Sequence, residues 1–326
     1  MENAFLRFLY GNAIIKMDQM KRRAVVLERL QKLNKDSCGT EMTTEESRRI
    51  QLDMLRALAA FCDENGLRYF LSGGTLLGAI RHHGFIPWDD DIDVNMPRTD
   101  CERLLQLTDG RLDRYRIVGP DMDGFCPLCE SYRIYDPTAV IESWAGGYAK
   151  EPYYLPVFAD IFPIEGLPDG EWQTRLHYDR IVFARKMQRV SVLKHMEARS
   201  LSAHIFHVLA WIPARLVGYT NWSRLVQKIA TAYSMEEKAY IGVMTAPRQT
   251  TSEKVKKEDY LHAVPVLFEG NVFHAPSNYD VYLHQLYGDY MRLPPEEKRR
   301  SDHVFHMYWN RQNADQVTIP GKEHET

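Results

Sequence analysis

Four aspartates within five positions are the residues of this sequence best suited to chemistry. Asp89, Asp90 and Asp91 are consecutive, and Asp93 follows after one apolar residue. Carboxylates this close repel one another unless a positive charge lies between them. Side chains two apart in a strand point the same way, so Asp91 and Asp93 would offer oxygen ligands to Mg²⁺ or Mn²⁺ bridging phosphate oxygens. A solvated acidic loop is the alternative.

A glycine turn precedes the acidic cluster by about 15 residues. It reads Ser72-Gly73-Gly74-Thr75, and it stands between a short strand signal and a helical pattern. Glycines let a backbone approach a phosphate closely, and the exposed amides at a helix N-terminus favour an anion. We therefore expect a phosphate cradle that faces the metal-binding strand across a small cleft. An ordinary tight turn is the alternative.

Three further residues are candidates for the same site. Asp160 is a lone acid in the apolar run 157–162, and burying an unpaired carboxylate requires a cation, a donor or a raised pKa. A strand-end aspartate bonded to backbone amides is the alternative for Asp160. Arg81 and Arg133 are suited to contact phosphates, although a solvated surface position explains either arginine equally well.

The helices and strands expected to position these residues indicate the α+β fold class. The first half mixes helices with several strands, whereas the pattern from about Glu171 to about Tyr240 is almost wholly helical. Helices are expected within 1–33, from a capping box at Thr43 and Glu46 to Gly66, and over 75–81, 98–107 and 278–286. Strands are expected at 68–71, 92–96, 115–118, 131–135, 138–143 and 157–162, with a hairpin at 263–274.

The overall composition excludes several classes of protein. The chain has 326 residues, with 41 Lys and Arg against 44 Asp and Glu, and 44% of its residues are hydrophobic. Such a chain can bury a sizeable core, and it has no basic excess that would indicate nucleic-acid binding. An odd count of five cysteines fits a reducing cytoplasm. No signal peptide or membrane span is expected from the hydropathy pattern.

Three segments together resemble the successive signature blocks of the LicD family. They are GGTLLGAIRHHGFIPWDDDIDV, FADIFPIEGLP and APSNYDVYLHQLYGDYMRLPPEEKR, and they lie within residues 68 to 303. The family includes bacterial phosphocholine transferases and is related to the fukutin-related protein. The resemblance implies a nucleotidyltransferase-like fold in which Asp91 and Asp93 match the metal-binding pair and Asp160 fits the third carboxylate.

The resemblance also implies an enzyme, a metal-dependent phosphotransferase. It would transfer a phosphocholine-like phospho-alcohol from a CDP-alcohol to a hydroxyl of a cell-surface glycan or a lipid-linked glycan precursor, such as lipopolysaccharide or teichoic acid, and release CMP. The segment 72–75, Arg81 and Arg133 would bind substrate, and Asp160 would complete the metal shell or accept the acceptor's proton. A nucleotidyltransferase that releases pyrophosphate and a non-catalytic nucleotide-binding scaffold are the alternatives.

We accordingly expect a mixed sheet with flanking helices and a largely helical C-terminal half. The expected divisions are N-terminal helices at 1–66, a catalytic core at 67–170, a helical subdomain with a short hairpin that completes the active site at 171–310, and a frayed tail at 311–326. The tyrosines of the third block, Tyr279, Tyr282 and Tyr287, would stack on a base or an alcohol headgroup, or would belong to the core.

A basic stretch within the expected helical subdomain suggests a further partner. Residues 175–199 contain seven Lys or Arg against two acids, and the apolar segment 201–218 follows. Together, residues 175–218 would lie on an anionic membrane surface, which would make the protein cytoplasmic and peripheral at the inner face of the membrane. A helical subdomain with a solvated basic face is the alternative.

Overall fold

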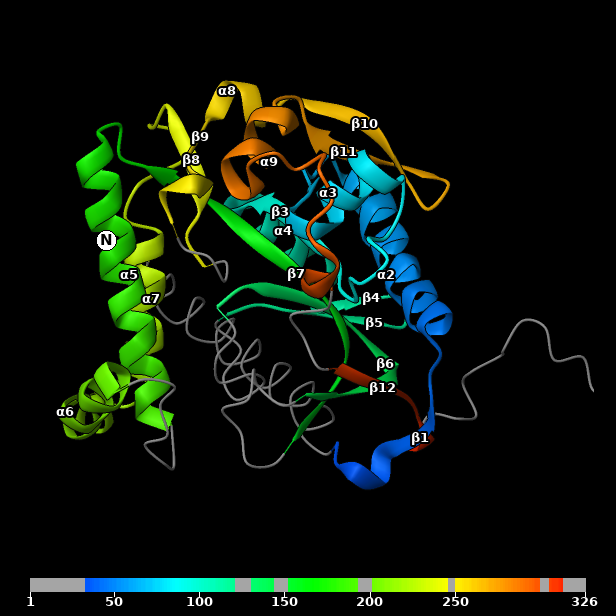
Figure 1. Cartoon of the computed structure of the whole chain (residues 1–326), viewed down its shortest axis with the longest axis horizontal. Coiled ribbons are helices and arrows are strands. Elements are labelled where there is room, and N and C mark those ends of the chain that lie inside the picture. The colour runs from blue at the N-terminus through cyan, green and yellow to red at the C-terminus, as the bar shows by residue number, and fades with distance from the viewer. Residues whose placement is uncertain are drawn as a thin grey trace, which may run out of the picture.

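The computed structural model describes residues 33–120, 130–143, 152–192, 201–245, 250–299 and 305–312 (Figure 1). The helices expected within residues 1–33 and most of the tail lie outside these ranges. The described α-helices are α2 (Thr44–Asn65), α3 (Gly73–His82), α4 (Arg98–Thr108), α5 (Glu171–Val192), α6 (Leu201–Val217), α7 (Tyr219–Ala230), α8 (Lys257–Tyr260) and α9 (Tyr279–Tyr287). Short 3₁₀ turns are η1 (Lys35–Ser37), η3 (Thr251–Glu253) and η4 (Glu296–Lys298).

A mixed sheet with ten described strands forms the centre of the fold, with the order β1-β12-β6-β7-β3-β2 along its main path. Its strands are β1 (Cys38–Glu41), β2 (Phe70–Leu71), β3 (Asp93–Pro97), β4 (Arg111–Leu112), β5 (Tyr115–Val118), β6 (Tyr132–Ser143), β7 (Tyr153–Leu167), β8 (Tyr240–Val243), β9 (Val255–Lys256) and β12 (Phe305–Asn310). A separate hairpin joins β10 (Ala263–Phe268) to β11 (Asn271–Pro276). The expected α+β class is confirmed.

Local sequence signals explain how α2 begins and ends. The hydroxyl of Thr43 accepts a hydrogen bond from the backbone N–H of Glu46, and the Glu46 carboxylate accepts one from the N–H of Thr43, which is the expected capping box. Gly66 ends the helix in the left-handed conformation, with φ of 62°. The apolar face of α2 contacts β6 and β7, so this helix covers the part of the sheet next to the acidic turn.

One parallel strand pair lies at the centre of the sheet. β3 runs parallel to β7, and Asp93 stands directly opposite Asp160. β6 pairs with the other side of β7 in the antiparallel sense and places Arg133 opposite Asp160. Because cross-strand neighbours share a face of the sheet, these three side chains form one row across three adjacent strands.

Several strands were not predicted from the sequence. β1 and β12 pair with each other although they lie at opposite ends of the described chain, and β8 adds to β7 after the helical segment. The runs at 131–135 and 138–143 belong to one strand, β6, which is interrupted by an irregular register between Asp136 and Val140. A continuous strand with a bulge reads as two strands in a sequence because the bulge breaks the alternation of apolar side chains.

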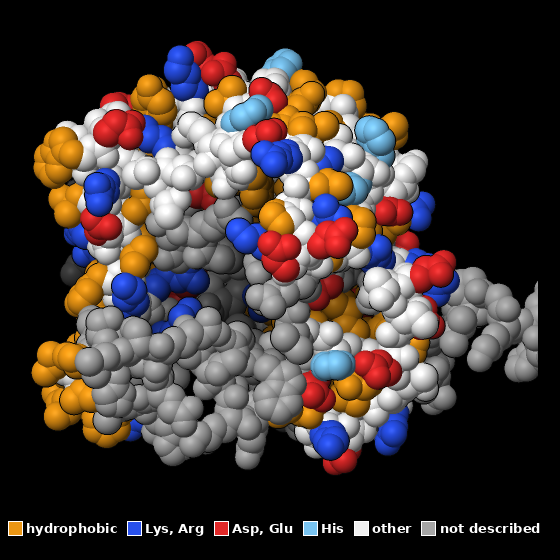
Figure 2. Space-filling view, in the orientation of Figure 1, with side chains coloured by type: hydrophobic (Ala, Val, Ile, Leu, Met, Phe, Trp, Pro, Cys, Tyr) orange, Lys and Arg blue, Asp and Glu red, His pale blue; other side chains and the backbone are white. Residues whose placement is uncertain are grey.

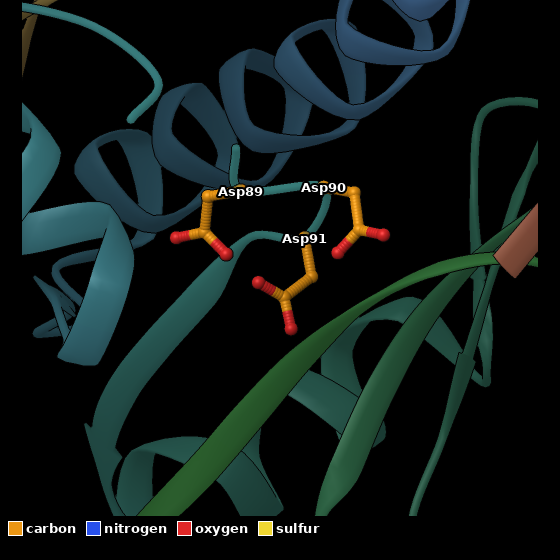
Figure 3. Close-up of side chains that lie close together, drawn as sticks. All are labelled: Asp89, Asp90 and Asp91. Atoms are coloured by element: carbon orange, nitrogen blue, oxygen red, sulfur yellow. The ribbon is translucent and has the colours of Figure 1, made fainter. Parts of the chain in front are cut away.

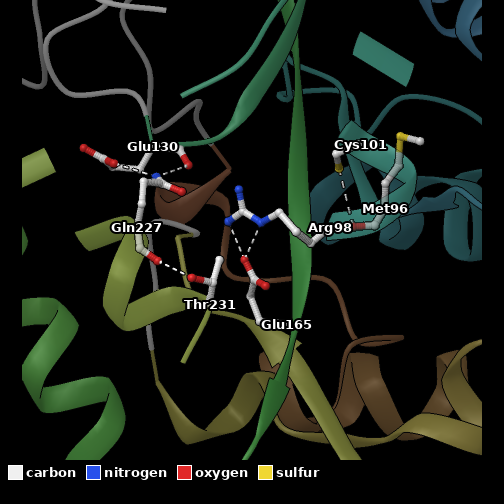
Figure 4. Close-up of polar contacts among 7 residues, drawn as sticks. All are labelled: Met96, Arg98, Cys101, Glu130, Glu165, Gln227 and Thr231. Carbon is white, nitrogen blue, oxygen red and sulfur yellow. Dashed lines mark hydrogen bonds and ion pairs between the residues drawn. The ribbon is translucent and has the colours of Figure 1, made fainter. Parts of the chain in front are cut away.

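The helices α5, α6 and α7 pack together around a second hydrophobic cluster. The buried carboxylate of Glu130, just before β6, connects two of these helices to the sheet. It accepts a hydrogen bond from Gln188 of α5. It also accepts one from Gln227 of α7 at 2.8 Å (Figure 4). A buried ion pair joins Arg98, at the start of α4, to Glu165 of β7. Among the described residues, no helix has both the length and the hydropathy needed to cross a bilayer.

Candidate active site

The first turn of α3 is built so that carboxylates approach its backbone closely. Ser72 precedes the helix, and its N–H donates to the carbonyl of Asp93 at 3.1 Å. Gly73 has φ of 51°, and a Cβ at this position would lie 3.0 Å from Oδ2 of Asp93. A Cβ on Gly74 would overlap with Oδ2 of Asp89. Gly73 is therefore favoured by its positive φ, and Gly74 by the close approach of the Asp89 carboxylate.

The acidic turn gathers three carboxylates in front of this helix. One oxygen of each of Asp89, Asp90 and Asp91 lies within 4.8 Å of the others, and Figure 3 shows the three side chains leaving the turn toward the same side. Ile92 is fully buried, whereas Asp91 and Asp93 on either side of it are partly exposed. The alternation expected for a strand is thus present, although β3 itself begins only at Asp93.

Two polar side chains of α2 hold the backbone of the acidic turn. One guanidinium nitrogen of Arg48, Nη2, donates to the carbonyls of Ile86, Pro87 and Asp89 at 2.9, 3.0 and 3.2 Å. The amide of Gln51 donates to the carbonyl of Asp90 at 2.6 Å. The sequence analysis missed both residues, but Gln51 carried a signal: it is a polar residue within the buried stripe of an amphipathic helix.

Replacement of Arg48 by alanine should lower the free energy of unfolding by about 1–3 kcal/mol, because three carbonyls lose their charged donor. Chemical denaturation measures this change. Arg49→Ala is the matched control, since Arg49 is exposed one position along the same helix and should change stability by less than about 0.5 kcal/mol. Equal effects of the two substitutions would contradict this role for Arg48.

The crowding of the carboxylates shifts their protonation. The pKa of Asp89 is raised to about 7, mainly by burial and in smaller part by the charge of Asp91. Burial also raises the pKa of Asp93 well above its ordinary range, and the charges of Asp91 and Asp160 add to the rise. Negative charge at this position thus exceeds what the surrounding protein compensates. Oxygen ligands with excess negative charge suit a divalent cation such as Mg²⁺ or Mn²⁺.

The raised pKa of Asp89 predicts a dependence of stability on pH when no metal is added. The folded protein holds this proton up to about pH 7, whereas the unfolded chain releases it near pH 4. Stability should therefore fall as pH rises between these values. Asp89→Asn should raise the thermal midpoint of the metal-free protein by roughly 2–6 °C at pH 8 and by less at pH 5. A constant difference at the two pH values would contradict the shift.

Asp160 is neutralised by donors from the neighbouring strand. Arg133 donates from Nε to Oδ1 of Asp160 at 2.6 Å and from Nη2 to Oδ2 at 3.4 Å, and Ser131 donates to Oδ1 at 3.2 Å. The guanidinium also lies over the ring of Phe158, 3.9 Å from its centroid. The carboxylate therefore has the donor that a partly buried acid requires, and the sequence analysis did not anticipate that Arg133 would provide it.

Thr75 and Arg81 fix the two ends of α3. The hydroxyl of Thr75 accepts a hydrogen bond from the N–H of Asp93 at 2.9 Å, which connects the glycine turn to the start of β3. At the other end, Nη1 of Arg81 donates to the carbonyl of Tyr290 at 2.6 Å. Arg81 thereby links α3 to the segment after α9, and a phosphate contact from Arg81 stays a prediction.

A buried polar network lies behind the glycine turn. The amide of Asn95 donates to the hydroxyl of Tyr260 at 2.8 Å and to that of Tyr282 at 3.4 Å. The hydroxyl of Tyr282 lies 3.3 Å from that of Ser72 and donates to Glu253 at 3.4 Å. All five residues are buried, so these contacts join β3, the glycine turn, η3 and α9 below the site.

The tyrosines of α9 accordingly divide between core and site. Tyr282 is 2% exposed and belongs to the core. The hydroxyl of Tyr287 lies 3.7 Å from the position that a Cβ on Gly73 would take, so this side chain borders the glycine turn. Tyr279 is partly buried and packs against the main hydrophobic core.

Comparison with known families connects this geometry to a named domain. Residues 66–121 match the family model described as LicD/FKTN/FKRP, nucleotidyltransferase domain. The matched region contains the glycine turn, α3, the acidic turn and β3, and it ends before Arg133 and Asp160.

Characterised relatives extend the similarity along the chain. The lipopolysaccharide cholinephosphotransferase LicD of Haemophilus influenzae is 29% identical over 271 residues, which cover 82% of this chain and 98% of that protein. The ribitol 5-phosphate transferase FKRP of Homo sapiens is 44% identical over 52 residues, which cover 15% of this chain and 10% of that protein. The first similarity therefore spans most of both chains, and the second is confined to one segment.

Proposed function

Because the chain carries a LicD-family nucleotidyltransferase domain, we propose that it transfers a phospho-alcohol from a CDP-alcohol donor to a hydroxyl of a glycan acceptor and releases CMP. The bacterial relative that aligns over nearly its whole length is named a cholinephosphotransferase, and the human relative is named a ribitol 5-phosphate transferase. Both names describe the transfer of a phosphorylated alcohol. The chain is accordingly a transferase, and phosphocholine is the first alcohol to test.

One observation carries the proposal: the carboxylate of Asp93 lies directly at the glycine turn. Its Oδ2 is 3.0 Å from the point where any side chain on Gly73 would begin. The backbone of α3 can therefore bind a phosphate oxygen while a carboxylate stands beside the same phosphate. The phosphate and the carboxylate are both negative and would repel each other at this distance, unless a cation lies between them.

The donor set fits Mg²⁺ or Mn²⁺. Asp91 and Asp93 would hold the cation, and their hard oxygens and the excess negative charge around Asp93 suit such an ion. When bound, the ion neutralises charge on the pyrophosphate of the donor. The Arg133 guanidinium forms an ion pair with Asp160. In the row across the sheet, negative charge therefore lies at Asp93 and Asp160, and positive charge lies at Arg133.

The remaining residues position the donor and the acceptor. The N–H groups of Gly73, Gly74 and Thr75, at the start of α3, would bind phosphate oxygens, and the helix dipole would favour their negative charge. Asp160 either completes the ligand set or accepts the proton of the acceptor hydroxyl. Ser131 and Arg133 orient that carboxylate in both cases. Positioning and electrostatic stabilisation would supply most of the rate acceleration.

A product analysis separates this proposal from its rivals. The chain would be incubated with Mg²⁺, a glycan or lipid-linked glycan acceptor, and a panel of CDP-activated choline, ethanolamine, ribitol and glycerol. Mass spectrometry should find an acceptor enlarged by a phospho-alcohol, together with CMP. An acceptor enlarged by a nucleotide would identify a nucleotidyltransferase instead, and nucleotide binding without any product would identify a scaffold.

A further inference from the structure

Among the residues of α6 whose burial is described, two alanines are buried and several large aliphatic residues are exposed. Ala210 and Ala214 are 5% and 0% exposed and belong to the cluster formed with α5 and α7. The indole N–H of Trp222 donates to the carbonyl of Ala214 at 3.0 Å, so α7 closes directly on this face. The exposed large residues are Ile205 (51%), Val208 (45%), Leu209 (73%), Ile212 (62%), Leu216 (82%) and Val217 (41%). This distribution is the reverse of that in an ordinary surface helix.

Five of these exposed residues, all except Val217, form one continuous stripe, which we call the α6 apolar face. Their spacing of three, four and seven positions places them on one side of the helix, over the three turns from Ile205 to Leu216. Figure 1 shows α6 at the lower left of the molecule, away from the sheet, and Figure 2 shows hydrophobic side chains gathered at that edge. A contiguous exposed apolar stripe marks an interaction surface.

Basic residues are concentrated in the part of the chain that contains α6. The sequence from 180 to 230 contains nine Lys or Arg and one acid, Glu197, in a chain whose net charge is −3. The exposed basic residues described on these helices are Arg175, Arg180, Lys186 and Arg189 of α5, Arg215 of α6, and Arg224 and Lys228 of α7, against two exposed acids, Glu171 and Asp179 of α5. The rest of the chain therefore carries an excess of acid, whereas the segment from 180 to 230 carries a net positive charge.

We propose that the α6 apolar face and the exposed basic residues of these helices dock on an anionic lipid bilayer. The helix would lie in the plane of the interface, with Leu209, Ile212 and Leu216 at the acyl boundary and the Lys and Arg side chains at the lipid phosphates. The 17 residues of α6 include Pro213 and are too few to span a bilayer. A second copy of the chain fits this face poorly, because it would bring two positive surfaces together.

Vesicle co-sedimentation of the full chain tests the proposal. The protein should bind vesicles of phosphatidylglycerol and phosphatidylcholine, and binding should weaken as salt is raised. The double substitution Leu209→Gln and Leu216→Gln should lower the partition coefficient about tenfold or more. Arg224→Gln with Lys228→Gln should lower it by a similar factor. Because all four side chains are exposed, the variants should keep the thermal midpoint of the wild type.

A matched control separates this face from general surface hydrophobicity. Leu267 and Val272 face each other across the β10–β11 hairpin and are 54% and 62% exposed. The double substitution Leu267→Gln and Val272→Gln should leave the partition coefficient unchanged. Absence of wild-type binding, equal binding to pure phosphatidylcholine, or an equal loss in the hairpin control would overturn the proposal. A dimer in sedimentation velocity that only the α6 leucine variant dissociates would also overturn it, by assigning the face to a second copy.

Discussion

Replacement of Asp93 by asparagine is expected to lower the rate of phospho-alcohol transfer about a thousandfold. Asp93 stands at the glycine turn, faces Asp160 across the parallel strand pair, and would offer the cation a carboxylate charge close to those of Asp91 and Asp160. Asparagine keeps the size of the side chain and removes that charge. Initial rates of CMP release from CDP-choline, measured over a range of Mg²⁺ concentrations, would show the loss.

The control for Asp93→Asn is Asp113→Asn. Asp113 is an exposed aspartate with φ of 50°, a conformation that asparagine also tolerates, and its substitution should leave the rate unchanged. Thermal unfolding should show that both variants fold. Without metal, Asp93→Asn should be at least as stable as the wild type near neutral pH, because asparagine replaces a carboxyl whose raised pKa lowers the stability of the folded state. An Asp93→Asn enzyme within threefold of the wild-type rate would exclude the proposed metal role of Asp93.

Replacement of Gly74 by alanine is expected to lower the rate about a hundredfold. The added Cβ would overlap with Oδ2 of Asp89, so the Asp89 carboxylate or the start of α3 must move. A displacement of about 1 Å between groups that bind one substrate is enough for such a loss. Steady-state kinetics with varied CDP-alcohol should show the change in both kcat and the KM for the donor.

The Asp89→Ala substitution supplies the internal control for Gly74→Ala. In the wild-type background, Gly74→Ala should lower the thermal midpoint. In the Asp89→Ala background, the same substitution should change the thermal midpoint little, because the overlapping carboxylate is absent. A double-mutant cycle of thermal or chemical unfolding measures this coupling. Additive effects of the two substitutions, or a Gly74→Ala enzyme with wild-type rates, would contradict the close packing of turn and helix that the site requires.

Signals confined to one segment were sufficient to predict most of the helices and the hairpin. Thr43 with Glu46 marks the start of α2 and Gly66 marks its end, and Glu269-Gly270 marks the turn between β10 and β11. These features depend on hydrogen bonds and backbone angles within a few residues, and the residue types at those positions predict them. The relation between the glycine turn and the aspartates was also accessible, because one short helix separates them.

Contacts between distant segments could not be predicted in the same way. The pairing of β1 with β12, the support of the acidic turn by Arg48 and the ion pair between Arg133 and Asp160 each join residues that are separated by other elements. The sequence shows that Asp160 needs a partner, but the strand order decides which residue stands opposite it. The register of β6 against β7 shows that two separate candidates, Asp160 and Arg133, lie opposite each other and form an ion pair.

The transfer of a specific phosphorus atom tests the central claim most directly. CDP-choline would be labelled with ³²P at the phosphate attached to choline and, in a parallel sample, at the phosphate attached to cytidine. After incubation with the chain, Mg²⁺ and a glycan acceptor, the first label should appear on the acceptor and the second in CMP. Label from the cytidine phosphate on the acceptor would contradict phospho-alcohol transfer, as would retention of both labels in unreacted donor across the panel of acceptors.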